Sequence, residues 1–439
     1  MKPLKKIGML IGLGLTLAWL LSACESLPFD LPWLELGKTT ATLPPSENGA
    51  MTPTPETTLS VTPTPEPVTS LTLWVPPEMD PNLETKASRL FANRLQVFSD
   101  LNDGIEITVR VKAMSGAGGL LDALTATSAA APDALPDLIA LPRPDLENAA
   151  LKGLIFPLDG LTEIPDDTDW YGFTREMALL QGSTFGLPFA ADSLILVYRP
   201  AALPEFPSDW TALVESGTVL AFSAGSDSYL FPMALYQAAG GIVQDNQRRP
   251  ALELEPLTEV FRLIDVGAQS GTFPDSLIQY QTTAQVWTAF REGQVNLAVS
   301  WFSNYLKEGL ADTAMVPLLP MSDRSVSYGT GMSWAVASPQ DHRHPVAVSL
   351  AEYLVQPEFL SEWTAAGGYL PPRPSALEGW QNQGLRGIVS QVALMTKLQP
   401  SNDIIASLGP VLREATRQII QDLLDPVQAA QIAVESLEE

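Results

Sequence analysis

Side chains that commonly perform covalent or metal chemistry are scarce in this sequence. The 439 residues include one cysteine, Cys24, and two histidines, His342 and His344, which flank Arg343 in a polar connector. One thiol excludes a disulfide framework and a thiolate zinc site, and two imidazoles leave few metal ligands. The chain contains no Gly-x-Ser-x-Gly elbow, no His-Glu-x-x-His motif and no complete Gly-x-x-x-x-Gly-Lys-Ser/Thr loop. We therefore expect no enzyme, no cofactor and no metal site, although a hydrolase with paired carboxylates stays open.

The cysteine lies at the end of a secretion signal. Lys2, Lys5 and Lys6 precede an apolar run over residues 7–21, and Leu-Ser-Ala-Cys occupies positions 21–24. The run is shorter than the ~20 residues that a bilayer-spanning helix needs, and small residues follow it as at signal-peptide cleavage sites. Leu-Ser-Ala-Cys resembles the bacterial lipobox, in which the cysteine sulfur carries a diacylglyceryl group. We expect residues 1–23 to be removed and Cys24 to anchor the protein to the outer face of the cell membrane. The alternative is an ordinary signal peptide that happens to contain a cysteine.

Residues 24–70 have the composition of a tether. They are rich in proline, threonine, serine and glutamate, and Thr-Pro-Thr-Pro-Glu occurs at 52–56 and again at 62–66. Such a segment buries too little apolar surface to offset its chain entropy, and its prolines favour extended conformations. We expect a disordered linker between the lipid and a folded part that begins near residue 71.

The net charge limits the partners. The chain has 25 Lys and Arg against 50 Asp and Glu, a formal charge of −25. Loss of the three lysines of the signal changes the formal charge from −25 to −28 in the mature form. Nucleic-acid binding rests on clustered basic residues, so no DNA or RNA partner is expected. The same charge disfavours electrostatic attraction of anionic ligands and leaves neutral solutes, or less readily cations, as the better candidates.

The folded part alternates strand and helix signals. Strand patterns occupy residues 71–75, 105–111, 137–141, 218–222 and 295–301, and helix patterns occupy 83–101, 120–131, 209–215, 227–239, 256–268 and 284–292, with mostly helix after 345. Alternation of this kind predicts parallel sheets flanked by helices. A folded part of about 370 residues fits two α/β lobes better than one.

Two pairs of residues lie where these elements place ligand contacts. Arg143 and Asp145 follow a strand at 137–141, and ligands of parallel sheets bind at the carboxyl ends of strands. Ser228 and Tyr229 open the helix that ends at Gly240, so their side chains and backbone N–H groups can face a cleft. Solvated loop charges are the alternative for the first pair, and plain helix caps for the second.

A series of segments resembles the extracellular solute-binding proteins of ABC importers, in particular the family 1, maltose-binding-like group. The segments are Pro-Asp-Leu-Ile at 136–139, Gly-Leu-Ile-Phe-Pro-Leu-Asp at 153–159, Gly-Leu-Pro-Phe-Ala-Ala-Asp-Ser at 186–193, Leu-Val-Tyr at 196–198, Asp-Trp-Thr-Ala-Leu at 209–213, Ala-Ala-Gly-Gly at 238–241, Ala-Phe-Arg-Glu-Gly at 289–293, Ser-Trp at 300–301 and Gly-Gly-Tyr-Leu-Pro-Pro-Arg at 367–373. Their order and spacing carry the resemblance, which spans roughly residues 71–437.

The resemblance implies a two-lobed periplasmic-binding-protein-like α/β fold of type II, with a mainly parallel sheet in each lobe. Lobe one would comprise residues 71–190 and 332–380, and lobe two residues 191–331 and 381–439. It further implies a monomer that binds a mono- or oligosaccharide in the cleft and delivers it to the transmembrane permease subunits of an ABC importer. The alternatives are a surface sensor or adhesin lipoprotein with the same fold, and a protein that binds a polyamine or a peptide.

The resemblance also implies roles for single residues. Trp301 would stack on the ligand, although Ser300 stands directly before it where the family often has Gly-Pro, and Asp192 lies where the family commonly places a ligand-binding acid. Core packing is the alternative for Trp301, and a cap or turn for Asp192. Two weaker ligand candidates are Trp334, for which core packing is the more ordinary role, and Arg373, which can instead pin a loop.

Overall fold

The computed structural model describes residues 67–321 and 323–437. The strands are β1 (Ser70–Val75), β2 (Glu106–Val111), β3 (Leu138–Pro142), β4 (Leu179–Leu180), β5 (Ser183–Thr184), β6 (Leu187–Tyr198), β7 (Leu220–Ala221), β8 (Leu297–Trp301), β9 (Ala314–Val316), β10 (Ser327–Val336) and β11 (Thr396–Leu398). The helices are α1 (Lys86–Leu101), α2 (Leu120–Ala130), α3 (Arg143–Leu151), α4 (Gly172–Glu176), α5 (Trp210–Glu215), α6 (Leu230–Ala238), α7 (Leu254–Ser270), α8 (Thr283–Arg291), α9 (Phe302–Glu308), α10 (His344–Leu354), α11 (Pro357–Gly367), α12 (Pro374–Glu378), α13 (Gln383–Met395), α14 (Asn402–Ile420) and α15 (Pro426–Glu435).

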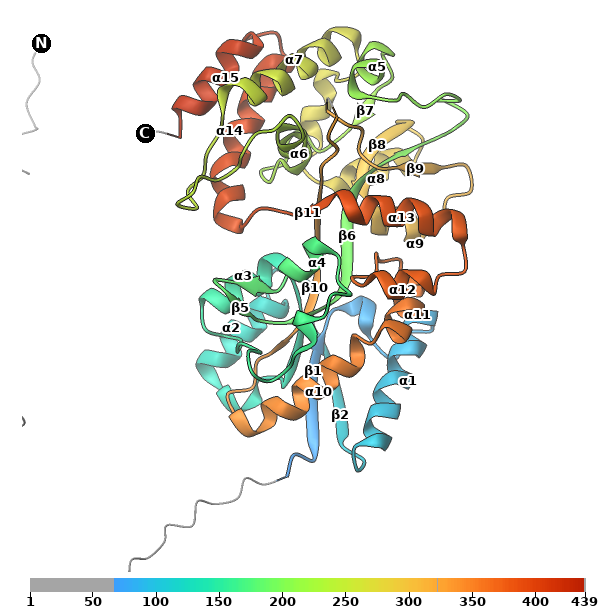
Figure 1. The fold of residues 1–439 in the computed structure, drawn as a ribbon, viewed down its shortest axis with the longest axis vertical. Coiled ribbons are helices and arrows are strands. Elements are labelled where there is room, and N and C mark those ends of the chain that lie inside the picture. Colours follow the sequence, from blue (N-terminus) through green and yellow to red (C-terminus); the bar gives the residue numbers. More distant parts are fainter. Residues whose placement is uncertain (1–66, 322, 438–439) are drawn as a thin grey trace, which may run out of the picture. The chain divides into compact units, whose positions relative to one another are not determined.

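Within the described residues, nine strands form one sheet in the order β2-β1-β3-β10-β6-β8-β7, with β11 beside β10 and β9 beside β6. β1 is parallel to β2 and β3, and β7 is parallel to β8. The long strands β6 and β10 are antiparallel to each other, β10 is antiparallel to β3, and β6 is antiparallel to β8. Helices flank the sheet on its faces (Figure 1). The α/β class that the sequence pattern predicts is therefore confirmed.

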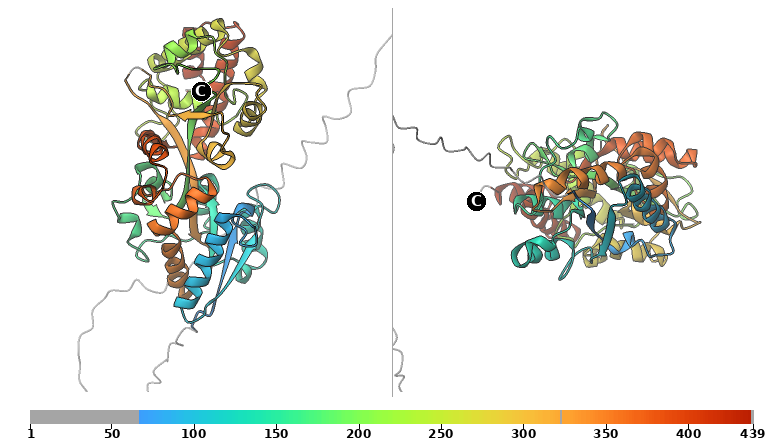
Figure 2. Two further views of the ribbon diagram at one scale, coloured as in Figure 1. Left: turned by 90° about the vertical axis from the view of Figure 1, so that its right-hand side faces the viewer. Right: turned by 90° about the horizontal axis from the view of Figure 1, so that it is seen from below.

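The strands β6 and β10 connect two lobes, each with its own apolar core (Figures 1 and 2). In the first lobe, the buried side chains come from β1, β3 and the helices α1, α2, α10 and α11. In the second lobe, they come from the distal part of β6, from β8, and from α5 to α8 together with α14 and α15. Residues of both strands belong to both cores, so these two strands link the lobes.

The C-terminal helices complete the second lobe. α14 and α15, which are consecutive in the chain, pack on each other, and both pack on α7, which lies more than 130 residues earlier; α14 also packs on α6. Buried side chains such as Leu408, Leu412 and Ile419 place one face of α14 in the core. None of the helices in the described part of the chain has the length and apolar character needed to cross a lipid bilayer.

Candidate functional site

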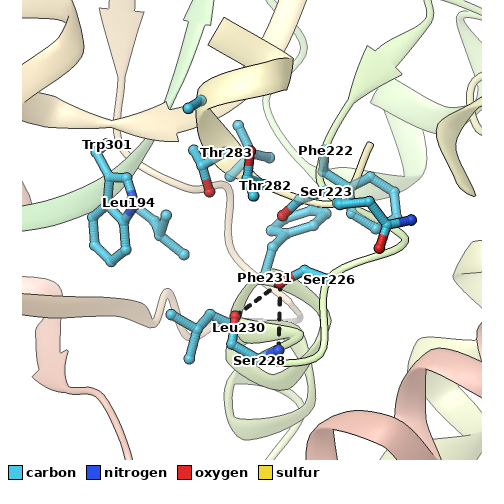
Figure 3. Close-up of a pocket in the computed structure, with 13 residues that line it drawn as sticks. Leu194, Phe222, Ser223, Ser226, Ser228, Leu230, Phe231, Thr282, Thr283 and Trp301 are labelled. Carbon is cyan, nitrogen blue, oxygen red and sulfur yellow. Dashed lines mark hydrogen bonds between the residues drawn. The ribbon is translucent and has the colours of Figure 1, made fainter. Parts of the chain in front are cut away.

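A cavity of about 320 Å³ opens on the second lobe at the carboxyl end of β8 (Figure 3). Part of the lining is apolar and contains Leu194, Phe222, Leu230, Phe231, Ala284, Val299 and Trp301, while the remaining side chains are polar: Ser223, Ser226, Ser228, Gln281, Thr282 and Thr283. An apolar surface with a few convergent hydrogen-bonding groups is typical of a small-molecule site. Among the described residues, no Asp, Glu, Lys or Arg side chain lines this cavity.

Trp301 reaches the cavity because it is the last residue of β8. It pairs with Leu194 of the antiparallel strand β6, and Val299 lies two residues earlier on the same face of the strand. The ring is half-buried and packs beside the core of the second lobe, with Leu194 next to it (Figure 3). The predicted strand and the position of Trp301 at its end are therefore present, and the indole forms part of the cavity wall.

The loop before α6 supplies the hydroxyl groups opposite the indole. The hydroxyl groups of Ser226 and Ser228 lie 3.0 Å apart, and the backbone N–H of Ser228 donates to Ser226 Oγ at 3.4 Å (Figure 3). Tyr229 follows in the left-handed conformation, with φ of 49°, and its side chain is only 1% exposed. Burial raises the pKa of this phenol well above its usual range. Of the predicted pair, Ser228 thus lines the cavity, whereas Tyr229 packs behind it in the core.

Helix α14 holds this loop in place. An added Cβ at Gly409 would lie 1.8 Å from the backbone oxygen of Asp227, so only glycine permits the helix to come this close. Arg413, one turn further along α14, forms an ion pair with the Asp227 carboxylate. The position of the Ser226 and Ser228 hydroxyls therefore depends on a helix that begins about 170 residues later in the chain.

Thr282 and Thr283 enter the cavity lining from the start of α8, and neither was among the ligand contacts predicted from the sequence. The Thr282 side chain accepts a hydrogen bond from the backbone N–H of Gln285 at 3.2 Å, and the Gln285 side chain accepts one from the Thr282 N–H at 3.3 Å. This reciprocal arrangement is a capping box. Its Thr-x-x-Gln pattern is visible in the sequence and marks Thr282 as the N-cap, so that the helix begins at Thr283, one residue before the expected position.

The carboxylate of Asp192 points into the second lobe and accepts hydrogen bonds within the protein. Oδ1 accepts from the backbone N–H of Ser303 at 3.0 Å and from that of Ser193 at 2.9 Å, and Oδ2 accepts from Ser303 Oγ at 2.5 Å. Burial raises the pKa of this carboxyl to about 6, against the opposing effects of these hydrogen bonds and of Lys307. Asp192 does not line the cavity that contains Trp301.

Arg143 and Asp145 are not brought together with Trp301. Arg143 is buried at the start of α3, forms an ion pair of 2.9 Å with Glu147, and lines a separate cavity of about 1090 Å³. The other oxygen of Glu147 accepts a hydrogen bond from the backbone N–H of Asn402 at 3.0 Å, which connects α3 to the start of α14. Asp145 is half-buried in α3, and burial raises the pKa of its carboxyl.

Trp334 and Arg373 also lie outside the Trp301 cavity. Trp334 is 1% exposed and stacks on Phe189, with ring centroids 4.7 Å apart, so it occupies the core of the first lobe. Arg373 is buried and pairs with Asp167 and with Asp169, the latter at 2.9 Å. The alternation of side chains along β10 turns the Trp334 ring into the core of the first lobe. The two aspartates bind the Arg373 guanidinium, which thus connects its own loop to residues 167–169.

The histidine connector differs from the expected loop. His344 is the first residue of α10, is buried, and its Nε2 lies 2.7 Å from the carbonyl oxygen of Ser338. Arg343 forms a bidentate contact with the Asp137 carboxylate at 2.6 and 2.9 Å. Among the described residues, no group of three or more His, Cys, Asp and Glu side chains is arranged to hold a metal ion.

Comparison with known proteins supports a binding fold. A family model described as bacterial extracellular solute-binding protein matches residues 95–386. No curated protein matches the chain. Among solved structures, the sugar-binding protein MalE from Xanthomonas citri is 18% identical with a TM-score of 0.68, covering 84% of this chain and 96% of MalE. A cyclo/maltodextrin-binding protein in complex with maltotetraose is also 18% identical with a TM-score of 0.68, covering 86% of this chain and 98% of that one.

A third solved structure has a different sugar bound. It is an ABC transporter solute-binding protein from Thermotoga lettingae with alpha-D-tagatose, and it is 17% identical to this chain with a TM-score of 0.64. The match covers 84% of this chain and 98% of that protein. At these identities the likeness establishes the two-lobed fold, and the ligands belong to the compared proteins.

Proposed function

This chain belongs to the bacterial extracellular solute-binding protein family, and from that premise we propose that it binds a neutral carbohydrate between its lobes for an ABC importer. The observation that carries the proposal is the cavity in which the Trp301 ring faces a hydroxyl-lined loop. Sugars have apolar C–H faces that pack on an aromatic ring and hydroxyl groups that hydrogen-bond to serine and threonine. The family binds solutes, so we propose no catalytic step.

The size and polarity of the cavity favour a small, uncharged ligand. Its volume of about 320 Å³ lies at the lower end of the ~300–1,000 Å³ range of ligand pockets, which favours a mono- or disaccharide over a long chain. The lining residues carry no formal charge, so an ionised ligand would lose hydration without gaining a charged partner. The structures with bound maltotetraose and tagatose show that proteins of this fold accept carbohydrates.

We propose that lobe closure completes the site. All lining residues of the Trp301 cavity lie between 194 and 301, within the bounds predicted from the sequence for lobe two, residues 191–331 and 381–439. The first lobe, residues 71–190 and 332–380, would cover the sugar when β6 and β10 flex. A ligand that contacts both lobes binds the closed state better than the open state and so stabilises it.

A thermal-shift screen of the purified protein tests the carbohydrate class. We expect at least one neutral sugar to raise the melting temperature, because a ligand that binds only the folded state stabilises it by mass action. Calorimetric titration then gives the stoichiometry and affinity. Stabilisation by a polyamine or a peptide, with no response to any mono- or oligosaccharide, would contradict the proposal.

We further propose that the protein acts on the outer face of the membrane, anchored by a lipid on Cys24 and serving permease subunits. Cys24, the signal and the tether up to residue 66 lie outside the described residues. The expected result is that wild-type protein sediments with membranes, whereas a Cys24→Ser variant loses the lipid mass and the membrane association. Mass spectrometry of the mature N-terminus measures the lipid mass, and fractionation measures the membrane association. A membrane-bound Cys24→Ser protein would refute the anchor.

A further inference from the structure

The aromatic ring of the proposed sugar site is held by a short helix that begins without a connecting loop. Trp301 is both the last residue of β8 and the N-cap of α9. Its φ of −72° and ψ of 141° are extended, and its indole side chain makes no capping hydrogen bond. The first backbone N–H groups of α9 therefore need an acceptor from elsewhere in the chain.

Asp192 provides that acceptor from the neighbouring strand. Leu194 of β6 pairs with Trp301, and Asp192 lies two residues from Leu194 on the same face, beyond the end of β8. Its carboxylate accepts the backbone N–H and the hydroxyl of Ser303, at 3.0 and 2.5 Å. With the third hydrogen bond from Ser193 N–H, most of the lone pairs of Asp192 are engaged within the protein.

The other end of α9 is held against the first lobe. Lys307 Nζ lies 4.1 Å from the centroid of the Tyr369 ring, a cation–π contact. An added Cβ at Gly368 would lie 2.5 Å from Lys307 Cγ, so the glycine permits this close approach. The Tyr369 ring in turn stacks on Trp363, with centroids 5.6 Å apart, in the first-lobe core. The helix that follows Trp301 is thus fixed at both ends.

We propose that Asp192 is a positioning residue for ligand binding: it caps α9 and thereby holds the Trp301 ring at the cavity, and it does not itself contact the sugar. This inference rests on the proposed function, since it concerns the orientation of the proposed stacking residue. It differs from the role that the resemblance implies for Asp192, that of a ligand-binding acid.

Substitutions at Asp192 separate the two roles. Asparagine has the same shape as aspartate, so its Oδ1 can still accept the hydrogen bond from the Ser303 N–H, and its amide can donate one to Ser303 Oγ. We therefore expect Asp192→Asn to keep the sugar affinity within about twofold of wild type. Asp192→Ala removes the cap and should weaken binding about tenfold. Ser303→Ala, which deletes one of the bonds, should give a smaller loss. Calorimetric titration with the sugar found in the thermal screen measures all three affinities.

A matched control excludes a general effect of losing a cap. Asp209 caps α5 by accepting the Ala212 N–H at 2.8 Å, and neither residue lines the cavity. Asp209→Ala should lower the melting temperature and leave the sugar affinity unchanged. Equal losses of affinity in Asp192→Asn and Asp192→Ala would mean that the carboxylate contacts the ligand, and would overturn the inference.

A spectroscopic measurement without ligand keeps the two proposals distinguishable. In protein labelled with fluorotryptophan, the fluorine resonance of Trp301 is assigned by its loss in Trp301→Phe. We expect this resonance to shift or broaden in Asp192→Ala and to stay near its wild-type position in Asp192→Asn and Asp209→Ala. An unmoved signal in folded Asp192→Ala would overturn the positioning role. A moved signal in a protein that binds no sugar would support the positioning role and refute only the carbohydrate function.

Discussion

An alanine in place of Trp301 should weaken sugar binding by about 1 to 3 kcal/mol, or roughly five- to 150-fold in the dissociation constant. The indole is the largest side chain in the cavity lining, and it lies beside Leu194 and Val299, so its removal takes away the broadest flat apolar surface that a sugar face could pack on. The ring is half-buried, so the loss of folding stability should be smaller than for a core tryptophan. Calorimetric titration against the sugar that best stabilises the wild-type protein measures the effect.

Two variants make that result specific to the ring and its position. Trp301→Phe retains an aromatic face of smaller area and should lose less affinity than Trp301→Ala. Phe206→Ala removes another half-buried ring of the second lobe, one that packs on Tyr198 with centroids 4.5 Å apart and does not line the cavity. It should lower the melting temperature while the affinity stays unchanged. If folded Trp301→Ala bound sugar as well as wild type, the ring would have a packing role only.

A methyl group at Gly409 should lower the free energy of unfolding by about 3 kcal/mol and weaken ligand binding at the same time. The added Cβ would overlap the backbone oxygen of Asp227, and backbone cannot rotate aside as a flexible side chain can. Helix α14 or the loop before α6 must therefore move. Since Ser226 and Ser228 of that loop line the cavity, their hydroxyls would move with it. Denaturant unfolding and calorimetric titration of Gly409→Ala test the two consequences.

The matched control is another glycine inside a helix. Gly387 lies in α13, is exposed, and an added Cβ would have no atom within 4 Å. Alanine there should stabilise the protein by up to about 1 kcal/mol, because it reduces the flexibility of the unfolded chain and favours the helix. The same substitution thus has opposite signs at the two sites. A Gly409→Ala protein as stable as Gly387→Ala would show that α14 has room beside the loop.

Local patterns in the sequence were sufficient for the elements that carry the site. Alternating apolar residues and helical spacing predict the class of fold, and the strand ending at Trp301 and the helix α8 lie within a few residues of the expected positions. The helix before Gly240 begins later than predicted, at Leu230, because Ser226 and Ser228 bond to each other and Tyr229 adopts a left-handed conformation. That conformation turns the tyrosine side chain into the core, which a pattern of residue types does not show.

The remaining site predictions depended on contacts between distant residues. Trp334 lies within β10 and Trp301 at the end of β8, so their sequence contexts are similar. In the structure, the Trp334 ring packs between Phe91 and Phe189 in the core, whereas the Trp301 ring lines a cavity. Asp192 has the residue type of a ligand acceptor, and its hydrogen bonds to a serine 111 positions away engage it within the protein.

By itself, the sequence determined the α/β alternation and the resemblance to solute-binding proteins, and it predicted the signal with its cysteine and the tether, because each of these depends on residues that are neighbours in the chain. Only the tertiary structure decided which side chains meet. It placed Trp301 with Ser226, Ser228 and Thr282, and it directed the Asp192 carboxylate to the start of α9. The physical reason is that strand pairing and close helix packing bring together residues separated by 100 positions or more, and local periodicity carries no information about those partners.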